Sequence, residues 1–290
     1  RTRKVSGVES LAMAANVFVG QTEAPLCVGP YVARMRRSEL ATLMVGGFAT
    51  IAGSVLAAYV GMLGGDDPAQ REAFIKHLLT ASLLSAPAAF VIARIIVPKE
   101  QDSDQDDVHQ VSLERQGNVL EAAAEGATQG LKLALNVAAM LVAFVALLAL
   151  LNALLGWLGG LVGLDQLSIE WLMGALLSPL AWAMGVPWED SSFFGTLLGK
   201  KLAVTEFLAY DALATDMASA TPRLSERSAA IAAYALCGFA NFASIGFQIG
   251  WLSSLAPERR GEIAGLSLRL MLGGAMASWM TASIAGLFIA

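Results

Sequence analysis

The sequence has few of the residues on which metal and nucleophilic chemistry depend. It holds two cysteines and two histidines among 290 residues, so neither a zinc motif, a CxxC pair nor a Ser-His dyad can be assembled. It also lacks a GxxxxGK phosphate loop and a basic nucleic-acid patch. Charged residues make up only 15% and hydrophobic residues 56%, against about 25% and about 45–50% in soluble domains. We therefore expect an integral membrane protein with no cofactor and no nucleic-acid partner.

Long uncharged runs support this interpretation. A membrane-crossing helix needs about 20 apolar residues, and residues 40–65, 133–164, 228–257 and 270–290 each reach that length. A fifth run, 78–93, does so if its flanks join the helix. The sequence thus predicts a multi-pass protein of the plasma membrane or the bacterial inner membrane, with the lipid bilayer as its surroundings.

The segment Gly20-Gln21-Thr22-Glu23-Ala24-Pro25 is polar and lies between two uncharged stretches that are each too short to cross a bilayer. Two half-helices meeting at Glu23 would form a re-entrant hairpin. Non-helical backbone is tolerated at membrane depth only where it is buried in protein or lines a watery cavity. A carboxylate there is costly enough to indicate a functional site.

A repeat relates the two halves of the chain. The segment Gly47–Gly53 returns as Gly238–Ser244, and Phe18–Gly20 is echoed by Phe207–Ala209, beside Glu206. The repeating unit is a hairpin, a broken helix and a further helix. An odd number of crossings separates the two units, so the second is inserted upside down. The predicted fold class is an all-α integral membrane protein, an inverted repeat of the kind found in secondary transporters.

The predicted organisation has four parts. An acidic linker is expected on the cytoplasmic side, because arginines and lysines gather at that end of the predicted topology. A long transmembrane helix follows the linker and joins the two repeats. The boundaries are 1–98 for the first repeat, 99–117 for the linker, 118–164 for the long helix and 165–290 for the second repeat.

Some polar residues in these apolar segments can be interpreted either as functional residues or as packing contacts. Glu23 and Glu206 occupy equivalent repeat positions, and a charge near the membrane centre costs about 2.5–3.5 kcal/mol, which favours function over packing. Asn241 and Ser244 interrupt an apolar run and serve either in binding or as polar contacts between helices. Asn16 and Thr50 stay open on this evidence alone, since threonine commonly bonds its own helix backbone.

Five stretches resemble the concentrative nucleoside transporter family and occur in the family's order. The resemblance implies an ion-coupled importer of nucleosides that assembles as a homotrimer and works by an elevator-type alternating-access mechanism. Family members carry further N-terminal scaffold helices, so we expect this chain, which begins at Arg1, to correspond to the C-terminal two-thirds. The stretches are Ala14–Pro25, Gly46–Ser54, Gly185–Asp190, Glu206–Tyr210 and Cys237–Ile245.

The same resemblance assigns roles to individual residues. The first hairpin would address the nucleobase through Gln21, Thr22 and Glu23. The ribose hydroxyls would bind Glu206, Asn241 and Ser244. Sodium, the coupling ion, would be held by Asn16, Val19, Thr50 and Ile51, and the helix 118–164 would mediate trimerisation. The chain departs from the family at Thr205-Glu206, where Asn-Glu is usual.

The resulting hypothesis is a sodium-coupled nucleoside symporter, with nucleoside and sodium as its ligands, and not an enzyme. A proton-coupled transporter is the alternative, in which Glu23 or Glu206 would carry the proton. An intramembrane hydrolase that uses these two carboxylates as acid and base is less favoured, because the sequence offers no nucleophile with a base. A chain that only binds its ligand is a further alternative.

Overall fold

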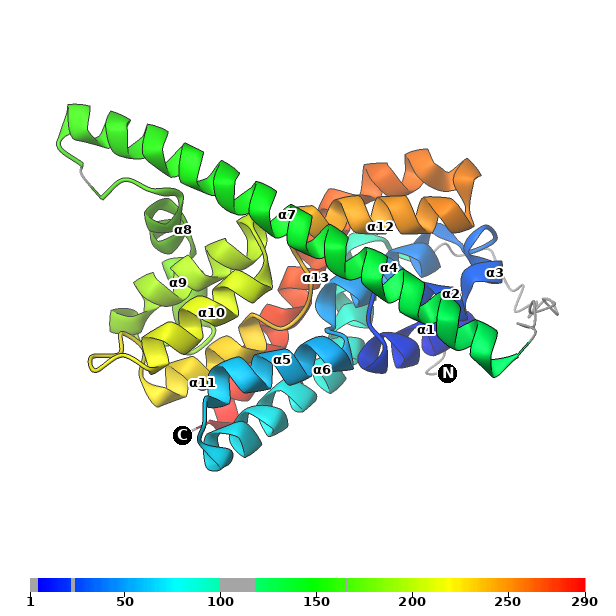
Figure 1. Cartoon of the computed structure of the whole chain (residues 1–290), viewed down its shortest axis with the longest axis horizontal. Coiled ribbons are helices and arrows are strands. Elements are labelled where there is room, and N and C mark those ends of the chain that lie inside the picture. Colours follow the sequence, from blue (N-terminus) through cyan, green and yellow to red (C-terminus); the bar gives the residue numbers. More distant parts are fainter. Residues whose placement is uncertain (1–4, 22–23, 100–117, 165, 290) are drawn as a thin grey trace. The chain divides into compact units, whose positions relative to one another are not determined.

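The computed structural model describes residues 5–21, 24–99, 118–164 and 166–289, and within these residues it contains helices and no strands (Figure 1). The first repeat opens with a helix that ends at Phe18, followed by two single-turn helices, as expected for a re-entrant hairpin. A broken helix and a long continuous helix come next. These elements are α1 Gly7–Phe18, α2 Ala24–Cys27, α3 Gly29–Val32, α4 Arg37–Ala49, α5 Gly53–Gly64 and α6 Pro68–Ile96.

The second repeat has the same order of elements. A hairpin formed by α9 and α10 is followed by a broken helix, α11 and α12, and then by the long helix α13. One further helix, α8, precedes the hairpin and is bent by 119° relative to α9. The bounds are α8 Ile169–Ala183, α9 Trp188–Ala203, α10 Glu206–Met217, α11 Glu226–Ala235, α12 Phe242–Leu255, the 3-10 turn η1 Pro257–Arg259, and α13 Arg260–Phe288.

Local sequence explains where these helices begin and break. Ser6 and the Glu9 side chain form a capping box at the start of α1, which satisfies two backbone N–H groups that would otherwise lack partners. Thr50, Thr205 and Asn241 all have extended backbone, with ψ of 162°, 156° and 165°. Each of these residues lies where one half-helix ends and another begins. The two broken helices thus break at Thr50 and Asn241, the polar positions that the repeat of Gly47–Gly53 at Gly238–Ser244 aligned.

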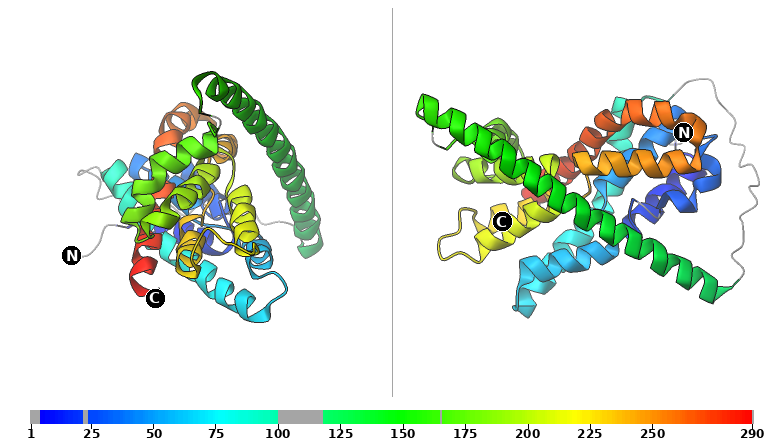
Figure 2. Two further views of the ribbon diagram at one scale, coloured as in Figure 1. Left: turned by 90° about the vertical axis from the view of Figure 1, so that its left-hand side faces the viewer. Right: turned by 45° about the horizontal axis from the view of Figure 1, so that its top comes forward.

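The repeats pack together around α13. This helix contacts α4 and α6 of the first repeat, and α11 and α12 of the second. Helices α5 and α6 lie side by side, as do α9 and α10 (Figures 1 and 2). Buried apolar side chains form two clusters, one around α5, α9, α10 and α11 and the other around α4, α12 and α13.

The described residues 118–164 and 166–169 belong to a separate compact unit. Its main element is α7 Val119–Val162, a helix of 44 residues that coincides with the long helix expected from the sequence. Asn118 caps its start by accepting a hydrogen bond from the backbone N–H of Glu121 at 2.8 Å. Most of the predicted linker, from residue 100 to 117, lies outside the described residues.

The lengths and compositions of the helices agree with a membrane protein. Four segments among the described residues are long and apolar enough to cross a bilayer, and the bent pair α8 and α9 would make a fifth. The predicted fold class, an all-α membrane protein with an inverted repeat, is confirmed. The four segments are Arg37–Gly64, Pro68–Ile96, Val145–Val162 and Pro257–Phe288.

Candidate functional site

Glu206 is the centre of a buried polar cluster at the second hairpin. It is the first residue of α10 and is only 4% exposed. Its Oε1 accepts a hydrogen bond from the Tyr59 hydroxyl at 3.0 Å, and its Oε2 accepts one from Asn241 Nδ2 at 2.8 Å. A carboxylate in the first turn of a helix is also stabilised by the helix dipole, typically by about 0.3–1 kcal/mol. The carboxylate is thus held by groups from both repeats.

Asn241 links Glu206 to the start of α12. Its Oδ1 accepts a hydrogen bond from the backbone N–H of Ser244 at 2.8 Å, as an N-cap does. Its amide nitrogen is therefore the end directed at Glu206. All three residues are buried. The Glu206 and Asn241 side chains contact each other, and Ser244 joins them through its backbone N–H.

The nucleobase residues of the first hairpin are described in part. Gln21 Oε1 accepts a hydrogen bond of 3.4 Å from Gln248 Nε2, which also donates to the Met44 carbonyl at 3.1 Å. Gln248 lies on α12, one helical turn after Ser244. The structure therefore places Gln21 against α12, the helix that Asn241 caps and that carries Ser244. Thr22 and Glu23 lie outside the described residues.

The four proposed sodium ligands come from two facing elements. The Asn16 side chain is fully buried, and neither its amide nitrogen nor its amide oxygen has a hydrogen-bond partner among the described residues. Thr50 Oγ1 donates to the Gly46 carbonyl at 2.9 Å. A Cβ built on Gly46 would lie 3.3 Å from Asn16 Nδ2, so Asn16 and Thr50 both lie next to this residue.

Val19 directly follows α1, and Ile51 lies in the break between α4 and α5. Their backbone carbonyls, with the Asn16 amide oxygen and the Thr50 hydroxyl, are oxygen donors of the type that small hard cations prefer. Discontinuous helices supply such ligands in many transporters. The chemistry of these four residues therefore fits a sodium ion.

Two glycines allow the broken segments to approach each other. Gly20 has φ of +96°, and a Cβ there would lie 2.7 Å from the Cβ of Ala52. Gly238 has φ of +94°, and a Cβ there would lie 2.6 Å from the carbonyl oxygens of Phe48 and Ala49. Residues with side chains rarely adopt these backbone angles. The first hairpin tip and the second break thus both pack directly on the first broken helix.

Sequence analysis missed a buried lysine in the second hairpin. Lys201 is fully buried, and its Nζ donates to the carbonyls of Ala235 and Cys237 at 3.0 and 2.8 Å. Ser278 also donates to the Cys237 carbonyl, at 2.6 Å. These carbonyls lie where α11 ends, so the ammonium group satisfies helix-end acceptors that would otherwise lack donors. Tyr59 was missed as well, since a tyrosine in an apolar run carries no signal beyond packing.

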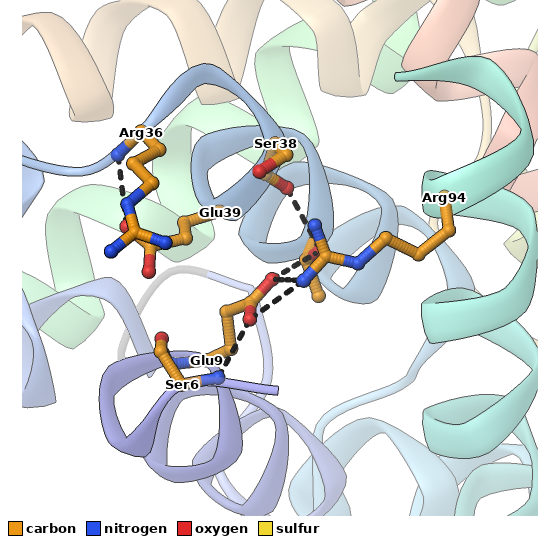
Figure 3. Close-up of polar contacts among 7 residues, drawn as sticks. Ser6, Glu9, Arg36, Ser38, Glu39 and Arg94 are labelled. Carbon is orange, nitrogen blue, oxygen red and sulfur yellow. Dashed lines mark hydrogen bonds and ion pairs between the residues drawn. The ribbon is translucent and has the colours of Figure 1, made fainter. Parts of the chain in front are cut away.

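A second buried charge anchors the first hairpin, as Figure 3 shows. Glu9 is 2% exposed, and its two carboxylate oxygens accept hydrogen bonds from Arg94 Nη2 at 2.7 and 2.9 Å. The Thr42 hydroxyl donates to Oε1, and the backbone N–H of Ser6 donates to Oε2, both at 2.9 Å. Glu9 therefore ties the start of α1 to α4 and α6.

The chain is similar in sequence to known proteins. A family described as "Na+ dependent nucleoside transporter C-terminus" matches residues 77–286, and one described as "Nucleoside recognition" matches residues 3–66. The chain is 43% identical to an uncharacterized transporter, YutK, of Bacillus subtilis, covering 98% of this chain and 68% of the relative. It is also 43% identical to the nucleoside permease NupC of Helicobacter pylori, covering 98% and 66% respectively.

A solved structure is similarly close. The chain superposes with a TM-score of 0.86 and 42% identity on CNTnw in an inward-facing substrate-bound state, covering 98% of this chain and 65% of that one. Structures of the same relative in outward-facing and intermediate states match as well. The chain thus spans about two thirds of the length of these relatives.

Proposed function

The chain belongs to the concentrative, Na+-dependent nucleoside transporter family, and we propose that the protein is a sodium-coupled symporter that imports nucleosides. The family consists of transporters, so the chain is not an enzyme and the hydrolase alternative is excluded. The observation that carries the proposal is the buried Glu206 carboxylate, held by Tyr59 at 3.0 Å and by Asn241 at 2.8 Å.

The proposed substrate follows from the chemistry of this cluster. A carboxylate accepts hydrogen bonds only, whereas an amide and a hydroxyl also donate. Glu206, Asn241 and Ser244 together suit a vicinal diol such as that of ribose. Gln21 contacts Gln248, which lies on α12 with Ser244. In the proposed site Gln21 faces the nucleobase, as do Thr22 and Glu23.

The proposed coupling ion is sodium, bound by Asn16, Val19, Thr50 and Ile51. The buried Asn16 amide, which has no hydrogen-bond partner among the residues that the structure describes, supports this assignment. An unsatisfied buried polar group typically costs about 1–3 kcal/mol unless a ligand satisfies it. Sodium would bind where the first hairpin tip packs on the first broken helix. Ion binding there would stabilise the hairpin that addresses the nucleobase, which is the basis of coupling.

We also propose an elevator-type alternating-access cycle in a homotrimer. The solved states of CNTnw support alternating access, because they include inward-facing and outward-facing arrangements. The family resemblance assigns trimerisation to the long helix α7, whose segment Val145–Val162 is long and apolar enough to cross a membrane.

Uptake by the protein reconstituted in lipid vesicles tests this function. Radiolabelled uridine should accumulate intact when sodium is outside, and uptake should disappear when choline replaces sodium at constant pH. One sodium ion per nucleoside, at about 100 mV and a roughly tenfold sodium gradient, supplies about 3.7 kcal/mol, enough for roughly 400-fold accumulation. Full uptake in choline, driven by an acid exterior, would overturn sodium coupling and favour the proton-coupled alternative.

Two variants make this test specific to the site. Glu206→Gln should abolish most of the uptake, because it removes the charged acceptor at constant volume. Glu189→Gln makes the same chemical change at an exposed position of α9 and should leave uptake unchanged. Equal uptake by both variants would argue against Glu206 as a substrate ligand.

A further inference from the structure

The hydrogen bonds of Glu206 determine how much of its carboxylate is available to a ligand. A carboxylate has about four lone-pair positions, two on each oxygen. Tyr59 occupies a position on Oε1, and Asn241 occupies a position on Oε2. The residue's own backbone N–H also interacts with the carboxylate, so at most about two positions remain for other donors. Two vicinal hydroxyl groups could use both, provided that the carboxylate keeps this orientation.

Tyr59 is rigidly held behind the carboxylate. Its side chain is fully buried, and its ring stacks on that of Tyr210, with centroids 4.2 Å apart and an interplanar angle of 27°. The Tyr210 hydroxyl in turn donates to the Ala233 carbonyl at 2.8 Å. The Tyr59 ring is therefore held by aromatic packing, and its hydroxyl is held by the hydrogen bond to Glu206. Because the hydroxyl donates to this carboxylate, it would act on a ligand through Glu206.

We propose that Tyr59 is a positioning residue for ribose recognition: it holds Oε1 of Glu206 so that the remaining acceptor positions face the two ribose hydroxyls. The inference rests on the proposed function and deepens it. The terminal side-chain torsion angle of a glutamate has a broad distribution. Without the Tyr59 hydroxyl, the carboxylate would therefore rotate more freely about that bond and align less well with a diol. Because Tyr59 lies on α5, the ribose half of the site depends on the first repeat as well as the second.

The variant Tyr59→Phe tests this proposal because it keeps the aromatic stack and removes only the hydroxyl. Calorimetric titration of the purified protein in sodium should show uridine affinity reduced by about five- to tenfold. The affinity for 2′,3′-dideoxyuridine, which lacks both hydroxyls, should stay within about twofold of the unmodified protein. Equal losses for the two ligands, or no loss for uridine, would overturn the proposal.

Tyr234→Phe is the matched control. Tyr234 is also a buried tyrosine, but its hydroxyl lies 3.2 Å from His77 Nδ1 rather than at Glu206. This variant should bind both ligands as the unmodified protein does. A selective loss of uridine affinity in Tyr234→Phe would show that the effect of removing a tyrosine hydroxyl is not specific to Glu206, and would overturn the proposal.

A double variant tests whether Tyr59 acts through Glu206. In the Glu206→Gln background, Tyr59→Phe should change uridine affinity by less than about twofold, whereas full additivity would indicate an independent structural role. If Tyr59→Phe does not fold, 3-fluorotyrosine at position 59 preserves the ring and strengthens the donor. Uridine affinity should then change while dideoxyuridine affinity does not, and a parallel change would count against the proposal.

The same measurements separate this inference from the proposed function. If the unmodified protein binds uridine and Glu206→Gln removes its preference over dideoxyuridine, the proposed ribose site stands. If Tyr59→Phe then bound uridine with unchanged affinity, only the proposed role of Tyr59 would be overturned. If the unmodified protein binds no nucleoside at all, the proposed function itself fails.

Discussion

Replacing Arg94 by methionine removes the charged partner of Glu9, which Figure 3 shows beside it. Glu9 is buried, with 2% of the residue exposed, whereas the Arg94 side chain is 23% exposed. Breaking a buried pair in this way typically destabilises a protein by about 3–5 kcal/mol, because the remaining charge is uncompensated. Glu9 keeps the hydrogen bonds from Ser6 and Thr42. The expected loss is therefore near the lower limit, about 3 kcal/mol.

Unfolding of the purified protein in detergent micelles, followed by its helical ellipticity, measures this loss. For chains of about 150–250 residues, 1 kcal/mol corresponds to about 2–4 °C in the unfolding midpoint. Arg94→Met should therefore lower the midpoint by roughly 6–12 °C. Combining it with Glu9→Gln should recover part of this loss, because no unpaired charge remains.

Lys76→Met provides the control for removing a positive charge. Lys76 pairs with Glu72 at 2.6 Å, but both side chains are 70% exposed. Exposed pairs of this spacing contribute about 0.3–0.5 kcal/mol, so the midpoint should barely move. If Arg94→Met were no more destabilising than Lys76→Met, the reasoning from the burial of Glu9 would be refuted.

Two further predictions concern the second hairpin and the second broken helix. Asn241→Ala and Ser244→Ala should each couple to Glu206→Gln by about 0.5–3 kcal/mol in cycles of uridine affinity, and additive losses would instead indicate a packing role. Lys201→Met should lower the free energy of unfolding by about 1–3 kcal/mol, because the Ala235 carbonyl loses its donor. Chemical denaturation measures this change, and unaltered stability would contradict the helix-capping role of Lys201.

The fold was largely predictable because its signals are local or periodic. Polar residues such as Thr50 and Asn241, within otherwise apolar runs, marked the helix breaks, and the repeat of Gly47–Gly53 at Gly238–Ser244 paired them. Helix α8 was not predicted as a separate element, since its sequence is as apolar as that of a spanning helix. Its 119° bend relative to α9 depends on the short connection between them and on tertiary packing.

The residues of the candidate site were predictable where they occupy equivalent positions in the two repeats. They were not predictable where their importance depends on a contact between distant parts of the chain. Glu206 and Asn241 were found from their polarity inside apolar segments. Tyr59 and Glu9 were missed because their partners, Glu206 and Arg94, are far away in sequence. A buried charge that is already paired in the fold looks the same in the sequence as a charge at a helix end. Only the tertiary structure distinguishes the two.

The way in which Glu206 is stabilised also bears on the charge of the substrate. Its carboxylate lies at the start of α10 and contacts Asn241, the N-cap of α12, so two helix N-termini lie near its negative charge. The buried ammonium of Lys201 hydrogen-bonds the carbonyls at the end of α11, and its charge also attracts the Glu206 carboxylate. Glu206 is therefore stabilised by dipoles, by hydrogen bonds and by a positive charge that occupies none of its oxygens. With ribose bound at Glu206 as proposed, a phosphate group on it would bring a second negative charge beside this carboxylate in a medium of low dielectric. The proposed site therefore favours nucleosides over nucleotides.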